Sequence, residues 1–113
     1  MPEKILLRSA RDQAALVRDG GVSARELVEA CLGAIERLDG ELNAFVTLVP
    51  ERALAEADAV SAGDSRPLAG VPVAIKDMLA LTEGIRTTFG MRATGDWVPS
   101  MDSAVVRLSL IHI

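Results

Sequence analysis

The sequence predicts an α/β chain in which helices and short strands follow one another and the sheet is incomplete. Three observations carry this prediction: an amphipathic helical pattern over residues 23–38, a β-prone run at 45–49, and an apolar run at 71–75 that stops at Lys76. The resulting order is helix, helix, strand, helix, strand, which is the order of an α/β layer. No internal repeat, low-complexity tract or interdomain linker interrupts it.

Two helices are predicted in the N-terminal part of the chain. Ser9 has the side chain of a helix N-cap, and Gly20 follows where that first helix is expected to end. Ser23 and Glu26 have the spacing of a capping box for the second helix, and Gly40 is its expected end. The second helix has an apolar stripe made of Leu27, Val28, Cys31, Leu32, Ile35 and Leu38.

Two short strands are predicted further along, with a helix between them. Residues 45–49 are rich in β-forming side chains and are closed by Pro50, which suits the first turn of a helix over 51–62. Residues 71–75 form an apolar run that only Pro72 interrupts, as in a buried strand with proline near its first position. The loop between this helix and the second strand is rich in Gly, Asp and Ser.

Lys76 is the candidate catalytic residue, because it stands where the second predicted strand ends. Ligands of α/β sheets gather outside the carboxyl ends of the strands. A lysine at that place would be partly buried, and burial favours the neutral amine, which accepts a proton. By position alone, the ordinary alternative is a lysine that reaches solvent or pairs with Asp77. For Asp77 we expect hydrogen bonds with backbone N–H groups that hold the local turn.

Composition excludes several other classes of function. The 113 residues can form one small domain, and half of them are apolar. A net charge of -4 without a Lys/Arg cluster argues against direct nucleic-acid binding, and no apolar run has the length of a membrane span. Cys31 is the only cysteine, and no Cys/His cluster has metal-ligand spacing. We therefore expect a cytoplasmic protein without a metal.

Three stretches of the chain resemble the amidase signature hydrolases. They are VSARELVEACLGAIERLDGELNAFV (22–46), LAGVPVAIKD (68–77), and GIRTTFG (84–90) with DWVPSMDSAVVRL (96–108). Together they cover nearly the whole chain up to about Leu108 in the order of the family. The resemblance implies the N-terminal portion of the amidase signature α/β/α fold, with a mixed central sheet that is incomplete in this chain.

Members of that family use a Ser–cis-Ser–Lys triad, and the resemblance places its lysine at Lys76. In this scheme the neutral amine draws a proton, through the bridging serine, from the serine that attacks the amide carbonyl. The family places both serines in a Gly/Ser-rich loop that would lie downstream of Ile113. The chain would therefore carry only Lys76 of the triad, and we expect it to be inactive by itself. Met78 and Met91 depart from the Asn and Ser that are common in the family.

The resemblance also divides the chain. Residues 1–107 are expected to be the N-terminal part of a single amidase domain, with a last helix that opens at Ser100 or Asp102. Residues 108–113, LSLIHI, depart from the family pattern and look like the translated end of a transposon-type sequencing adaptor. Our hypothesis is that these six residues are a non-native read-through tail.

The implied function is hydrolysis of a carboxamide C–N bond in a small-molecule substrate, without metal or organic cofactor, by a protein that acts alone or as a homodimer. Three alternatives stay open. The first is the A subunit of a tRNA-dependent glutamine amidotransferase, which works with partner subunits. The second is a non-catalytic interaction module, in which the helix over 23–38 docks on a partner and Lys76 is incidental. The third is a Schiff-base lysine enzyme.

Overall fold

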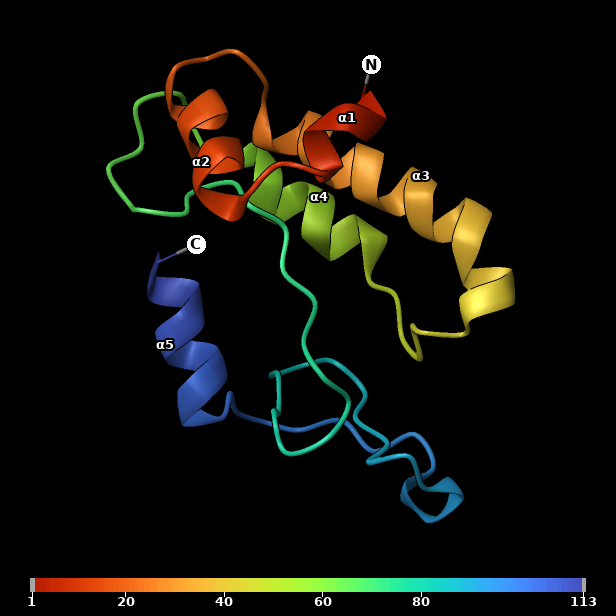
Figure 1. Cartoon of the computed structure of the whole chain (residues 1–113). Helices are drawn as coiled ribbons and strands as arrows, with labels where there is room; N and C mark the ends of the chain where they lie inside the picture. The colour runs from red at the N-terminus through yellow and green to blue at the C-terminus, as the bar shows by residue number, and fades with distance from the viewer. Residues whose placement is uncertain (1, 113) are drawn as a thin grey trace.

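The computed structural model describes the backbone of residues 2–112 and the side chains of residues 4–110. Its regular elements are all helical (Figure 1): α1 Pro2–Leu6, α2 Ala10–Arg18, α3 Ala24–Leu42, α4 Pro50–Asp58, a 3-10 turn η1 Arg92–Thr94, and α5 Ala104–His112. Residues 2–112 contain no β-strand. The prediction of an α/β fold with an incomplete mixed central sheet is therefore wrong for this chain.

The two predicted strands, 45–49 and 71–75, are irregular chain for a physical reason. A strand is stable only when its backbone N–H and C=O groups pair with a neighbouring strand. Among the described residues, no backbone hydrogen bond joins these two segments to each other or to another strand. The second run was expected to be buried, but Val73 is 48% exposed and Ile75 is 36% exposed. Its β propensity is real, yet that propensity depends on packing partners.

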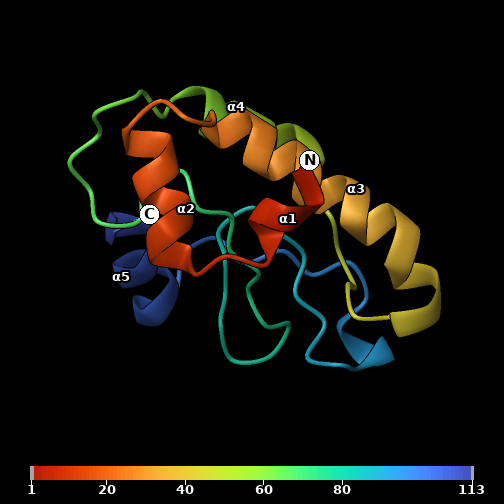
Figure 2. The same cartoon turned by 45° about the horizontal axis from the view of Figure 1, so that its top comes forward.

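Helices α1 to α4 form a helical unit around a small core. Helix α3 lies against both α1 and α4 (Figures 1 and 2). Apolar side chains from three helices meet there, and Leu27 is completely buried. The buried members of the core are Val17, Ala24, Leu27, Val28 and Ala57. This unit is the part of the chain in which apolar residues find partners within the chain itself.

Local capping signals explain where the helices begin. The Ser9 hydroxyl accepts a hydrogen bond from the Asp12 N–H at 3.2 Å, as predicted for the start of α2. Ser23 and Glu26 form the predicted reciprocal capping box at the start of α3, with the Ser23 N–H donating to Glu26 Oε2 at 2.7 Å. These hydrogen bonds hold the pKa of Glu26 below its ordinary value.

The ends of the helices differ more from the predictions. Helix α3 passes through Gly40 and ends at Leu42, with a cap formed by Asn43 in the left-handed conformation with φ 51°. Asparagine tolerates this conformation because its short polar side chain can bond locally. Helix α4 begins at Pro50 as predicted but ends at Asp58, before the expected 62. Helix α1 was not predicted.

Gly70 lets the chain after α4 pass close to the helical unit. Its φ is +81°, a value that residues with a Cβ rarely adopt. A Cβ at this position would lie 2.9 Å from both Val17 Cγ1 and Ala24 Cβ. Glycine is therefore required here for two independent reasons, and the contact sets the direction in which the following segment leaves the core.

The segment from about residue 75 to 103 lies on one side of the helical unit in both views (Figures 1 and 2). Hydrogen bonds between distant backbone positions organise it, including Thr87 N–H to the Trp97 carbonyl at 3.2 Å and Gly84 N–H to the Pro99 carbonyl at 3.1 Å. The Phe89 and Trp97 rings stack with their centroids 6.0 Å apart. No helix among the described residues has both the length and the apolar character needed to cross a bilayer.

Candidate functional site

Lys76 lies in the open chain between the helical unit and the loops. Its side chain is exposed, so the prediction of a partly buried lysine is wrong for this chain. The reason is the same as for the missing strands: the sheet that would cover Lys76 does not form, and Ile75 beside it is exposed as well. The structure does place Lys76 on the wall of a cavity of about 430 Å³.

Three segments line this cavity: 44–47, 74–77 and 80–87. Its walls combine apolar side chains with a few polar groups, an arrangement typical of small-molecule sites. Thr47 is one of these polar residues, and its Oγ1 atom is buried without a hydrogen-bond partner among the described residues. Arg86 also lines the cavity and lies 3.4 Å from Asp96 through its Nε.

Asp77 ties the residue after Lys76 to a distant loop. Its Oδ1 accepts a hydrogen bond from the Thr88 N–H at 2.8 Å, and its Oδ2 accepts one from the Thr88 hydroxyl. The same hydroxyl accepts a bond from the Gly90 N–H at 3.1 Å, and the Thr88 carbonyl accepts one from the Thr94 hydroxyl at 3.0 Å. The expectation that Asp77 holds backbone N–H groups is confirmed.

The partner that Asp77 uses was not predicted. Thr87 and Thr88 were expected to serve in hydrogen bonding and capping, and both are buried, at 4% and 6% exposure. Their role in anchoring the Lys76–Asp77 segment depends on a contact across eleven residues of sequence. No local motif encodes such a contact. Thr47 and Arg86 were missed for the same reason, since only the tertiary structure brings them to the cavity.

The pKa of Asp77 offers a test of this anchor. The hydroxyl and N–H of Thr88 stabilise the carboxylate and hold its pKa below the ordinary value. Asp77 therefore contributes stability above its unfolded-state pKa of about 3.9, and that contribution is lost as the pH falls through the lowered value. We expect Thr88→Val to raise the pKa of Asp77 toward the ordinary value, as measured by NMR titration of its carboxyl carbon.

Thr94→Val is the matched control for this measurement. The Thr94 hydroxyl bonds to the carbonyls of Thr88 and Met91 but does not touch Asp77. Thr94→Val should leave the Asp77 titration where it is. An unchanged titration in Thr88→Val would show that the Thr88 hydroxyl does not stabilise the carboxylate.

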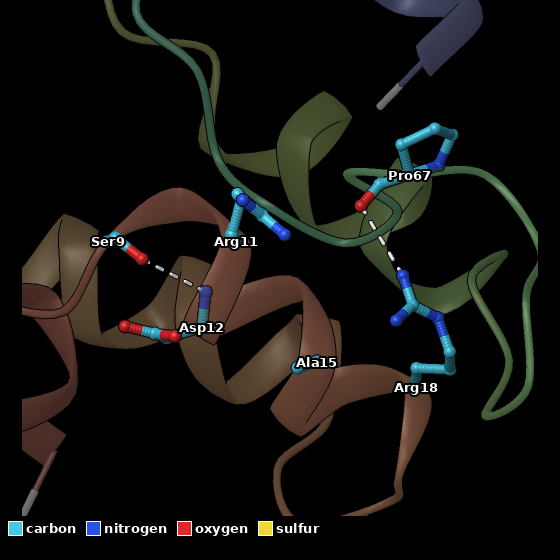
Figure 3. A pocket seen from close by; sticks show the side chains of 6 residues that line it. All are labelled: Ser9, Arg11, Asp12, Ala15, Arg18 and Pro67. Atoms are coloured by element: carbon cyan, nitrogen blue, oxygen red, sulfur yellow. Dashed lines mark hydrogen bonds between the residues drawn. The ribbon is translucent and has the colours of Figure 1, made fainter.

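A second cavity, of about 490 Å³, lies beside α2 (Figure 3). Its polar groups already have structural tasks: Ser9 caps α2, and Arg18 Nη2 donates to the Pro67 carbonyl at 3.4 Å. No nucleophile and base are paired there. Among the described residues, no group of three or more His, Cys, Asp or Glu side chains could hold a metal ion. The cavity lined by Lys76 is the candidate site.

Comparison with known proteins identifies what this arrangement resembles. The family model described as Amidase matches residues 26–109. The chain is 41% identical over 103 residues to the A subunit of the glutamyl-tRNA(Gln) amidotransferase of Chromohalobacter salexigens, covering 88% of this chain and 21% of the relative. It is 43% identical over 104 residues to the same subunit of Moorella thermoacetica, with 88% and 21% coverage.

A solved structure shares the fold. It comes from work described as an unexpected vestigial protein complex that reveals the evolutionary origins of an s-triazine catabolic enzyme. The TM-score is 0.79 at 33% sequence identity, and the match covers 93% of this chain but 24% of that one. The chain thus spans about a fifth of the length of the curated relatives it matches and about a quarter of this solved chain.

Proposed function

Because this chain belongs to the amidase family, we propose that it is part of a hydrolase that cleaves the C–N bond of a carboxamide, with Lys76 as the catalytic residue it supplies. The observation that carries the proposal is the position of Lys76. It lines a cavity and directly precedes Asp77, whose carboxylate is anchored to Thr88. A lysine on an anchored segment at a cavity wall is suited to proton transfer, which requires a fixed geometry.

In the proposed mechanism Lys76 acts as a general base. Its neutral amine accepts a proton through a bridging serine, and a second serine then attacks the amide carbonyl. The proton is returned to the leaving amine or ammonia when the C–N bond breaks. Both serines belong to parts of the relatives that this chain does not match. A more complete domain would also bury Lys76, and burial favours the neutral amine that the mechanism needs.

The substrate class has two candidates. The curated relatives support glutamine as the amide donor, because they are named as the A subunits of glutamyl-tRNA(Gln) amidotransferases. That reading implies partner subunits for this protein. The solved relative, connected with an s-triazine catabolic enzyme, supports a hydrolase of another small molecule. We place the protein in the cytoplasm in either case, since its single cysteine, Cys31, suits a reducing compartment.

A chimera tests the function and separates the two substrates. Residues 1–107 replace the matched region of the Chromohalobacter salexigens relative, and ammonia release is measured with glutamine and with a panel of simple amides. We expect amide hydrolysis by the chimera. Turnover confined to glutamine would favour the amidotransferase reading. A folded chimera that hydrolyses no amide, beside an active parent protein, would contradict the proposal.

A further inference from the structure

The chain beside the candidate site has unused hydrogen-bonding capacity. Among the described residues, the backbone of 46–48 and of 72–80 makes no hydrogen bond to other backbone groups. Segments of both stretches line the cavity that contains Lys76. Unpaired backbone of this kind is a template for pairing with a further strand.

Exposed apolar side chains gather on the same stretches. Large apolar side chains that should be inside a protein are exposed at Phe45, Val46, Leu48, Val73, Ile75 and Met78. We call these six residues the open face. A contiguous group of exposed apolar side chains marks an interaction surface in a water-soluble chain. The open face is separate from the core of the helical unit, where Leu27 and its neighbours are already covered.

A buried hydroxyl points to the same conclusion. Thr47 lies between two residues of the open face, and its Oγ1 atom is buried but has no hydrogen-bond partner in the described part of the chain. Leaving such a group unsatisfied costs about 1–3 kcal/mol. A strand laid along this face would bring backbone N–H and C=O groups within reach of Thr47, and so would satisfy the hydroxyl and the unpaired backbone together.

The solved relative indicates which polypeptide covers the open face. Its chain shares the fold of 93% of this chain, and this match uses 24% of it. About three quarters of that chain must therefore pack around the shared part. The core between α3, α1 and α4 is already filled within this chain. The open face has unpaired backbone, exposed apolar groups and an orphan hydroxyl beside it, so it is the surface best suited to receive that remainder.

We propose that the open face binds, as a separate polypeptide, the part of an amidase-family protein that this chain does not match, by adding a β-strand to the backbone of residues 72–76. The chain would then act as one half of a split amidase fold. The inference rests on the membership of the family and on the open face, and it does not depend on which reaction the assembled protein performs.

Co-expression with a defined partner tests the proposal. The chain of residues 1–113 is produced with the Chromohalobacter salexigens relative from which the matched region has been removed. We expect a one-to-one complex in size-exclusion chromatography with light scattering. We also expect the amide hydrogens of residues 73–76 to exchange more slowly in the complex than in the free chain. No complex, or a homodimer of the chain in place of a heterodimer, would overturn the proposal.

Charged substitutions on the open face locate the contact. Val73→Asp and Ile75→Asp should each weaken the complex by at least about tenfold, because they place a charge in a dry interface. Both side chains are exposed in the chain by itself, and an unchanged far-UV circular dichroism spectrum confirms that the free variants fold normally. Leu7→Asp is the matched control, since Leu7 is 89% exposed and lies outside the open face. Equal binding by all three variants would refute the proposed surface.

Lys76→Ala separates this inference from the proposed reaction. The variant should bind the partner as tightly as the original chain, whether or not the complex hydrolyses amides. A complex that forms without activity would leave the docking surface standing and count against the proposed chemistry. Loss of binding in Lys76→Ala, with Val73→Asp still binding, would overturn the docking surface.

Discussion

Lys76→Met in the chimera should lower kcat/KM for amide hydrolysis by about 10²-fold to 10⁴-fold, the range that positioned proton transfer contributes to catalysis. Methionine keeps most of the length and the apolar stem of lysine but has no amine to accept a proton. Substrate binding should change less than turnover, so the loss should appear mainly in kcat. The measurement is steady-state ammonia release over a range of amide concentrations.

Two further variants show whether the amine acts as a base or only as a positive charge. Lys76→Arg keeps the charge, but a guanidinium does not lose its proton in proteins, so this variant should be as inactive as Lys76→Met. Lys4→Met is the matched control, because Lys4 is the one other lysine of the chain and is exposed on α1. Activity retained in Lys76→Arg would show that Lys76 does not act as the base.

Leu27→Ala should destabilise the helical unit by about 2–5 kcal/mol, the usual cost of truncating a fully buried leucine. Leu27 is completely buried in α3 and contacts the small core that α1 to α4 share. A core of this size leaves little stability in reserve. We therefore expect the variant to lose most of its helical circular dichroism at 25 °C, or to unfold at a much lower urea concentration than the original chain.

Leu38→Ala is the control for this prediction, since it makes the same substitution on the same helix. Leu38 is 52% exposed, and surface substitutions usually change stability by no more than about 0.5 kcal/mol. The pair removes the effect of helix propensity from the comparison, because alanine replaces leucine in both. Equal urea midpoints for the two variants would show that Leu27 is not part of a stabilising core.

The parts of the fold that were predicted correctly are those determined by near neighbours. The caps at Ser9 and Ser23 depend on residues three positions away, so the sequence pattern alone identifies them. The end of α3 was misplaced because Asn43 can adopt the left-handed conformation usually assigned to glycine. The two strands were wrong because a strand requires a partner that the pattern of a single segment cannot supply.

The candidate site was predictable to a similar degree. The motif around Lys76 singled out that residue, and the structure places it on a cavity wall. Its catalytic role stays a prediction, as does the assignment of residues 108–113 to a read-through tail. The burial of Lys76 could not be judged from its own strand, since it depends on what covers that strand. The link between Asp77 and Thr88 joins residues eleven positions apart, and only folding reveals it.

The stacked pair of Phe89 and Trp97 has a practical consequence. Trp97 is the single tryptophan, and the chain has no tyrosine, so ultraviolet-excited emission arises from one place on the loops. Helical ellipticity, in contrast, reports almost entirely on α1 to α5. Following both signals through one thermal ramp would therefore reveal whether the loops melt together with the helices or as an independent cooperative unit.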